Sequence, residues 1–116
     1  MQILNLTPHN VVIVSEGEEV VTYSPEPTAA RVSVQTVQVG KITDQFGNRI
    51  PVTRSVYGKV TNLPEQKNGT AYIVSLLVAK AAKEEGRDIS DLFIPNETVR
   101  DEQGRIVGCQ SVADLL

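Results

Sequence analysis

Residues 70–86 read TAYIVSLLVAKAAKEEG, and this stretch decides the fold. Residues 70–74 are mostly apolar and favour a short buried strand. Ser75 follows, and its hydroxyl can accept a hydrogen bond from a backbone N–H two or three residues later, which makes it an N-cap. Residues 76–85 space their polar side chains three and four apart, which predicts a helix that is buried on most of its sides. Gly86 then supplies the left-handed residue at which such helices end.

The rest of the chain is dominated by residues that favour strands. It contains 17 Val and 8 Ile against 8 Leu, and β-branched side chains fit a pleated surface. We therefore predict an α+β fold, in which one helix near residues 75–86 packs on a mostly antiparallel β-sheet of about seven to eight strands. The other strands are expected at residues 2–6, 11–14, 19–23, 32–42, 50–60, 91–94, 99–100 and 105–109, with a polar tip at 15–18.

Turn chemistry adds local detail to this scheme. The pattern D-x-x-G occurs at residues 44–47 and 101–104, and it predicts a tight turn with a left-handed glycine in each hairpin. The first turn should pair residues 41–42 with residues 50–52. A break in the alternation near residues 35–36 indicates a bulge, and Pro95 is expected to end its strand because proline has no N–H to donate.

Length and composition limit the possible functions. A chain of 116 residues is expected to form a single domain. Its net charge of −3 disfavours general binding of duplex nucleic acid, which needs a basic stripe. The longest apolar stretch is too short to span a bilayer, and neither a signal peptide nor a disulfide is indicated, so we expect a soluble intracellular protein without a membrane partner.

Catalytic signatures are missing from the sequence. It has no phosphate-binding loop, dinucleotide fingerprint, nucleophile elbow or zinc-protease motif. One His and one Cys cannot build a zinc site, so neither a metal nor a cofactor is expected. Cys109 is interpreted as a small core residue, although a nucleophile–base pair with His9 stays open. An enzyme is thus the less favoured class.

Two candidate binding elements are polar. Thr7, His9 and Asn10 surround the rigid Pro8 between two strands and could present a fixed set of donors and acceptors. Turn chemistry accounts equally well for Thr7 and Asn10, but it does not require the histidine. Ser75 marks a helix N-terminus that could bind an anion, and the alternative is simple capping.

Cations supply the other candidate residues. Arg54 is either solvated or paired with an anion, and Tyr57 should lie on the opposite face of the same strand. Arg100 and Arg105 flank the second D-x-x-G turn, where two like charges repel unless something negative lies between them. That partner is either Asp101 or an anionic ligand, and both interpretations stay open.

Four strings carry a resemblance: NLTPH at residues 5–9, VYGKV at 56–60 followed by Leu63-Pro64, YIVS at 72–75, and VRDEQGRIVGC at 99–109. Together they resemble a largely uncharacterised family of small proteins from tailed phages, prophages and bacteria. The resemblance implies a phage setting and the cytoplasm of a bacterial host, and it brings no catalytic residues. By analogy, some small phage proteins are sponges that sequester the nucleotide second messengers of defence systems such as Thoeris or CBASS.

The leading hypothesis from the sequence is a non-enzymatic binding protein for a small anionic, nucleotide-like ligand, for example a cyclic nucleotide. In it the arginines neutralise phosphates, the Thr7–Asn10 turn binds sugar or base edges, and Tyr57 stacks on a base. A small chain has little room for a deep pocket, so we expect the site at a subunit interface of a homo-oligomer. The alternatives are a structural or protein-interaction module that docks through edge strands and residues 112–116, and a small hydrolase that uses His9 or an acidic pair such as Glu16 and Glu18.

Overall fold

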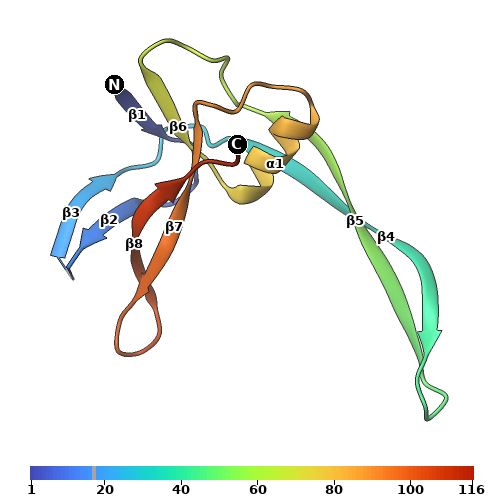
Figure 1. Cartoon of the computed structure of the whole chain (residues 1–116). Helices are drawn as coiled ribbons and strands as arrows, with labels where there is room; N and C mark the ends of the chain where they lie inside the picture. Colours follow the sequence, from blue (N-terminus) through green and yellow to red (C-terminus); the bar gives the residue numbers. More distant parts are fainter. Residues whose placement is uncertain (17) are drawn as a thin grey trace.

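The computed structural model describes residues 1–16 and 18–116, and its main body is a six-stranded sheet with one helix (Figure 1). The sheet has the strand order β1-β6-β7-β8-β2-β3, and β4 and β5 form a separate two-stranded ribbon. The prediction of a strand-rich α+β fold with a single helix is confirmed. In chain order the elements are β1 (Gln2–Asn5), β2 (Val11–Ser15), β3 (Glu18–Tyr23), β4 (Arg31–Thr43), β5 (Arg49–Thr61), β6 (Thr70–Ile73), α1 (Leu76–Glu84), β7 (Leu92–Arg100) and β8 (Ile106–Ala113).

The six-stranded sheet is mixed, so the predicted antiparallel pairing holds for only part of the body. β6 runs parallel to both of its neighbours, β1 and β7, and β2 runs parallel to β8. Only the pairs β2–β3 and β7–β8 are antiparallel. For β6 and β7 the reason lies in the connection through α1, because a helix that links two neighbouring strands returns the chain to the same end of the sheet and makes the strands parallel.

Helix α1 begins and ends where the sequence places it. The Ser75 hydroxyl accepts a hydrogen bond from the backbone N–H of Val78 at 3.2 Å, and Gly86 follows with a φ of +85°. The buried side of the helix packs on one face of the sheet, and together they form the main core. Its buried members are Leu6, Ala30, Tyr72, Val74, Val78, Ala79, Ala82, Ile89 and Leu92.

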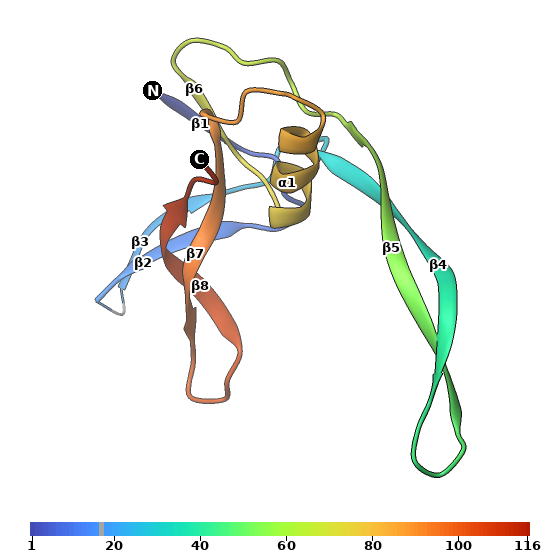
Figure 2. The same ribbon diagram turned by 45° about the vertical axis from the view of Figure 1, so that its right-hand side comes forward.

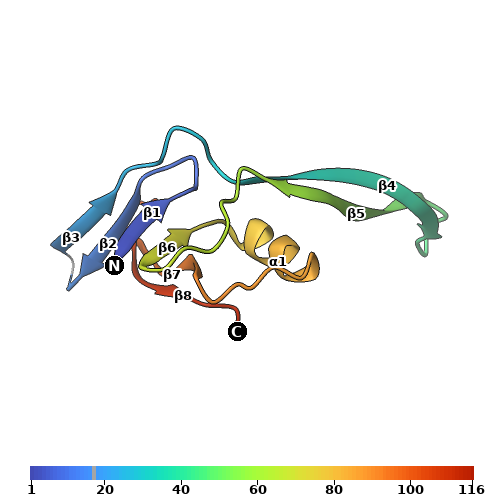
Figure 3. The same cartoon turned by 90° about the horizontal axis from the view of Figure 1, so that it is seen from above.

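The other face of the sheet is concave and carries a second, smaller core. Val11, Ile73 and Cys109 form its buried centre. An isolated bridge between Asn5 and Pro25 joins the end of β1 to the segment that follows β3, so the sheet curves round on itself at this end (Figure 3). The curvature leaves an apolar cavity of about 320 Å³ on the concave side, to which all six strands contribute.

The β4–β5 ribbon is an arm that extends away from the body (Figures 1 and 2). The Cα radius of gyration is 17.9 Å, whereas a compact domain of this length would have about 13 Å. The predicted hairpin is confirmed, since Lys41 pairs with Pro51 and Ile42 with Ile50. The bulge expected near residues 35–36 lies elsewhere, because the register shifts occur between Val32 and Val34 and between Gln38 and Gly40.

Strand β7 continues through Pro95, which corrects the expectation that this proline ends it. Its pairing with β6 stops at Phe93, while its pairing with β8 includes Pro95 opposite Val112. Beyond Phe93 one side of β7 therefore has no strand partner, and proline is tolerated at such an edge. Of the polar tip predicted at residues 15–18, Ser15 and Glu18 are register partners at the ends of β2 and β3, and Gly17 lies outside the described residues.

Candidate functional site

An open groove of about 530 Å³ lies where the Thr7–Asn10 turn, the start of α1 and the β7–β8 hairpin meet. It brings together four of the residues singled out in the sequence, namely Thr7, His9, Asn10 and Ser75. The parallel pairing of β1 with β6 explains this, because Asn5 is the register partner of Ile73 and the chain leaves both strands at the same edge of the sheet. The remaining lining residues are Pro8, Val11, Val12, Pro95, Thr98, Ile106, Val107, Gly108 and Cys109.

The turn that forms one wall of the groove is fixed by Asn5, a residue that the sequence analysis missed. Asn5 is only 1 % exposed. Its Nδ2 donates to the carbonyl oxygens of His9 at 2.7 Å and Tyr23 at 2.9 Å, and its Oδ1 accepts from the backbone N–H of Thr7 at 2.9 Å and from the Thr7 hydroxyl at 2.7 Å. The signal in the sequence was an Asn two residues before Thr7 at the end of a strand, which is the spacing of an Asx turn.

Within the turn, the side chains differ in how many hydrogen-bonding groups they leave free for a ligand. The Thr7 hydroxyl contacts Asn5 Oδ1 and the His9 carbonyl at 3.0 Å, so its hydrogen-bonding capacity serves the turn. His9 and Asn10 are exposed, and within the described part of the chain neither side chain makes a hydrogen bond. The imidazole and the amide are therefore the groups of this wall that can meet a ligand.

The Ser75 hydroxyl is likewise used inside the protein, as the N-cap of α1. Cys109 lies in the floor of the groove, 4 % exposed, with its Sγ 3.7 Å from the carbonyl oxygen of Val12. The interpretation of Cys109 as a small core residue is confirmed.

Arg100 and Arg105 are in different electrostatic situations. Arg105 Nε lies 2.9 Å from Asp101 Oδ2, and Asp101 Oδ1 accepts from the backbone N–H groups of Gln103 and Arg105. The backbone hydrogen bond from Arg105, supported by its side chain, lowers the pKa of Asp101 below its ordinary value. Arg105 thus has its own counter-ion, as one of the two interpretations held.

Arg100 keeps its charge without an acidic partner in the described residues. Its Nη1 donates to the carbonyl oxygen of Gly104 at 2.8 Å, which leaves the other guanidinium donors free. Its cross-strand partner is Ile106, which lines the groove. Arg100 does not itself line the groove, and a register shift between Val99 and Arg100 interrupts the ladder there, so its link to the groove is the backbone pairing with Ile106.

The structure does not bring Arg54 and Tyr57 to this groove within one chain. Both belong to β5 in the arm, and the arm leads away from the β7–β8 hairpin (Figure 2). Arg54 pairs with Val37 and Tyr57 with Val34, so the two side chains lie on opposite faces of the ribbon, as predicted.

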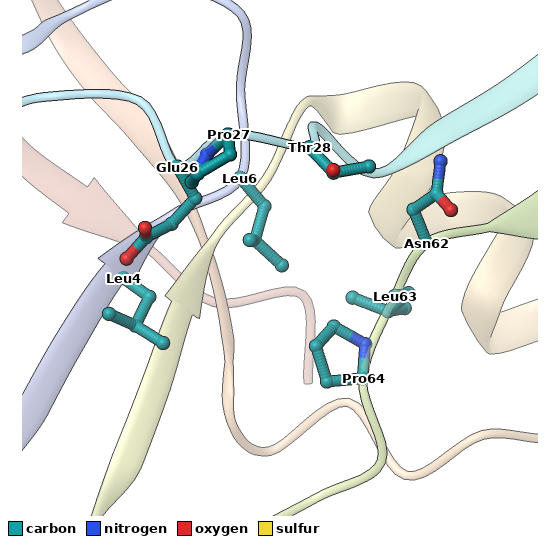
Figure 4. A pocket seen from close by; sticks show the side chains of 8 residues that line it. All are labelled: Leu4, Leu6, Glu26, Pro27, Thr28, Asn62, Leu63 and Pro64. Atoms are coloured by element: carbon teal, nitrogen blue, oxygen red, sulfur yellow. The ribbon is translucent and has the colours of Figure 1, made fainter.

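A second hollow, of about 590 Å³, lies at the base of the arm (Figure 4). Residues 26–28 and 62–64, which connect the arm to the body, form two of its sides, and Leu4 and Leu6 complete it. Its lining is apolar apart from Glu26, Thr28 and Asn62, and Glu26 lies beside Leu4 (Figure 4). It contains none of the residues predicted for the ligand site.

The described residues also bear on metal binding, on membrane spans and on the C-terminal segment. No group of three or more His, Cys, Asp or Glu side chains among them could hold a metal ion. No helix in that part of the chain is long and apolar enough to cross a membrane. Leu115, which the interaction hypothesis needed for an external partner, packs on the chain's own main core, while Leu116 is 78 % exposed.

Comparison of the chain with protein-family models, with curated proteins and with solved structures finds no match.

Proposed function

We propose that the chain is a phage-encoded, non-enzymatic binding protein that sequesters a small anionic, nucleotide-like ligand, in the manner of an anti-defence sponge. The observation that carries the proposal is the groove at the Thr7–Asn10 turn. It combines an apolar floor with the side chains of His9 and Asn10, which make no hydrogen bond in the described residues. Arg100, which has no acidic partner in that part of the chain, is the register partner of the lining residue Ile106. Ligand sites typically consist of such an apolar concavity with a few convergent polar groups.

Each of these groups has a distinct task in the proposed complex. Arg100 binds a phosphate, for which the planar guanidinium can offer two parallel N–H donors. His9 and Asn10 offer donors and acceptors to a sugar or a base edge. Asn5 takes no direct part, but its four hydrogen bonds hold the turn in one conformation, so the ligand does not have to order it.

The groove of one chain is open, and it lacks Arg54 and Tyr57. These two residues can join it only from another copy, which agrees with the expectation of a homo-oligomer whose ligand lies between subunits. Arg105 contributes less than Arg100 in this proposal because Asp101 compensates its charge.

Titration calorimetry of the purified chain against cyclic and linear nucleotides tests the proposal. We expect one class of nucleotide to bind, and we expect Arg100→Ala and His9→Ala each to weaken it by about 10-fold or more. Arg49→Ala is the matched control, because Arg49 is an exposed arginine on β5, opposite Thr43 and far along the arm from the groove. Bound nucleotide should be recovered chemically intact after heating. Silence across the nucleotides would refute the proposal, and a converted nucleotide would replace it with the hydrolase hypothesis.

The second candidate, a module that binds a host or virion protein without a ligand, is favoured by the exposed apolar side chains of the arm. A stable complex with a purified host or virion protein, formed equally well by wild type and by Arg100→Ala while no nucleotide binds, would favour it.

A further inference from the structure

The arm has one apolar and one polar face. Cross-strand partners share a face, and successive pairs alternate between faces. One face carries the pairs Ile42/Ile50, Gly40/Val52, Val37/Arg54 and Gln35/Val56. The opposite face carries Thr43/Arg49, Lys41/Pro51, Gln38/Thr53 and Thr36/Ser55, with Val34/Tyr57 near the base.

Nothing in the described chain covers the apolar face. Only the base of the arm is packed, where Val32 and Val60 contact the main core. Farther out, Val37, Ile42, Ile50 and Val56 are between 44 % and 58 % exposed. A continuous apolar strip on a two-stranded ribbon is unstable in water without a partner, since isolated hairpins are marginal.

The surface area of the chain indicates how large that partner contact is. The solvent-accessible surface is 8160 Å². A compact monomer of 12.6 kDa would expose about 6,200 Å². The excess of about 2,000 Å² matches what one subunit buries in a large, obligate dimer interface.

The charge distribution indicates what the partner is. Residues 31–61 contain five Lys and Arg and one acid, Asp44, and so carry a charge of +4. The whole chain has a charge of −3, so the remaining residues carry −7. No cation of the arm forms an ion pair within the described residues. A basic arm and an acidic body of the same chain are complementary, whereas two basic arms laid on each other would repel.

We infer that the arm is a dimerisation device: its apolar face lies on the acidic body of a second copy of this chain, and the second copy returns the contact. The hollow at the base of the arm is the surface on the body that suits it, because Glu26 lies beside apolar residues there (Figure 4). Arg54 is likewise set among aliphatic residues on the apolar face of the arm. A reciprocal contact of this kind is a closed two-fold interface. The inference supplies a second subunit, as the proposed function expects, but this contact places Arg54 at the hollow and not at the groove, and it does not depend on any ligand.

Sedimentation equilibrium without nucleotide tests the inference with substitutions at two neighbouring, exposed residues of the arm, Val37 and Gln38. We expect wild type to be a dimer of about 25 kDa, twice the chain mass. Val37→Asp, on the apolar face, should weaken dimerisation by about 30-fold or more, because the change occurs twice in a symmetric dimer. Gln38→Asp introduces the same side chain on the polar face and should leave the dimer intact. Circular dichroism checks that both variants stay folded.

Salt and a second pair of variants test the site on the body. Added salt should weaken the dimer, since the arm and the body attract through opposite charges. Glu26→Lys should weaken it as well, while Glu102→Lys, at the tip of the β7–β8 hairpin, should not. A dimer that strengthens with salt and ignores Glu26→Lys would overturn the arm-on-body arrangement.

Other outcomes overturn the inference as a whole. A monomer at the highest soluble concentration would do so, as would equal effects of Val37→Asp and Gln38→Asp. A monomer that binds nucleic acid through the basic arm would instead assign the arm to nucleic-acid binding. The proposed function and the inference about the arm can fail separately: a dimer that binds no nucleotide contradicts only the proposed function, and a nucleotide bound by a monomer contradicts only the inference about the arm.

Discussion

Replacing Asn5 by alanine should destabilise the protein far more than a residue in a surface turn normally does. The substitution removes four hydrogen bonds made by a side chain that is only 1 % exposed. The Thr7 hydroxyl can keep its alternative acceptor, the His9 carbonyl at 3.0 Å. Three bonds then remain lost at about 1 kcal/mol each, so the free energy of unfolding should fall by about 3 kcal/mol.

Urea denaturation followed by circular dichroism measures this difference, provided that the dependence on urea concentration is unchanged. Asn10→Ala is the matched control, because it alters the same residue type in the same turn but removes no hydrogen bond in the described part of the chain. We expect Asn10→Ala to change the stability by less than about 0.5 kcal/mol. Equal effects of the two variants would refute the role given to Asn5.

Asn5→Asp refines the test, because it keeps the acceptor and replaces the donor. At neutral pH a carboxylate would face the carbonyl oxygens of His9 and Tyr23, so burial should raise its pKa above the unfolded value of about 3.9. A raised pKa means that the variant is closest to wild type at low pH and loses stability as the pH rises through the folded pKa. A loss that does not depend on pH would contradict this account.

Two further predictions concern close packing and a turn. A Cβ on Gly108 would meet the carbonyl oxygen of Val12 at 2.8 Å, so Gly108→Ala should lower the free energy of unfolding by about 2 kcal/mol in urea denaturation. The nearest atom to a Cβ on Gly58 is the Ser33 hydroxyl oxygen, which can rotate away, so Gly58→Ala should change it by less than about 0.5 kcal/mol. The pKa of Asp44 is lowered from its ordinary value of 3.8, first by the Asn48 side chain and then by backbone N–H groups of the turn. The Asp44 carboxylate should therefore stabilise the hairpin tip above pH 3.8, and this stabilisation should disappear as the pH falls through the folded pKa. In an NMR titration, Asn48→Ala should move the pKa of Asp44 back towards 3.8. An unchanged pKa would contradict the role given to the Asn48 side chain.

Features with a local cause could be predicted from the sequence. Ser75 and Gly86 bound α1 because capping depends on a few consecutive residues. Both D-x-x-G turns form because the Asp side chain accepts from backbone N–H groups two and four residues later, as Asp44 and Asp101 do.

Features that depend on distant parts of the chain could not be predicted. The alternation in β4 and β5 is the same for a strand in a sheet and for a protruding arm, so nothing local showed that these strands leave the body. The parallel pairing of β1 with β6 joins segments almost 70 residues apart, and it is this pairing that places the His9 turn beside Ser75. Of the four hydrogen bonds of Asn5, the one to Tyr23 depends on a distant strand, whereas those to Thr7 and His9 follow the local spacing of an Asx turn.

The arm leaves and re-enters the body at one point, since Arg31 and Thr61 are register partners and the Asn62 side chain donates to the Ala29 carbonyl at 3.4 Å. Two residues added to each strand between these ends would therefore move the tip outward by about 7 Å without altering a single contact of the body. Such an insertion would also displace the apolar pairs of the arm relative to the surface they cover on another molecule. Related chains with arms of unequal length would then form homodimers and not heterodimers with each other, so that the length of one hairpin alone would determine the specificity of assembly.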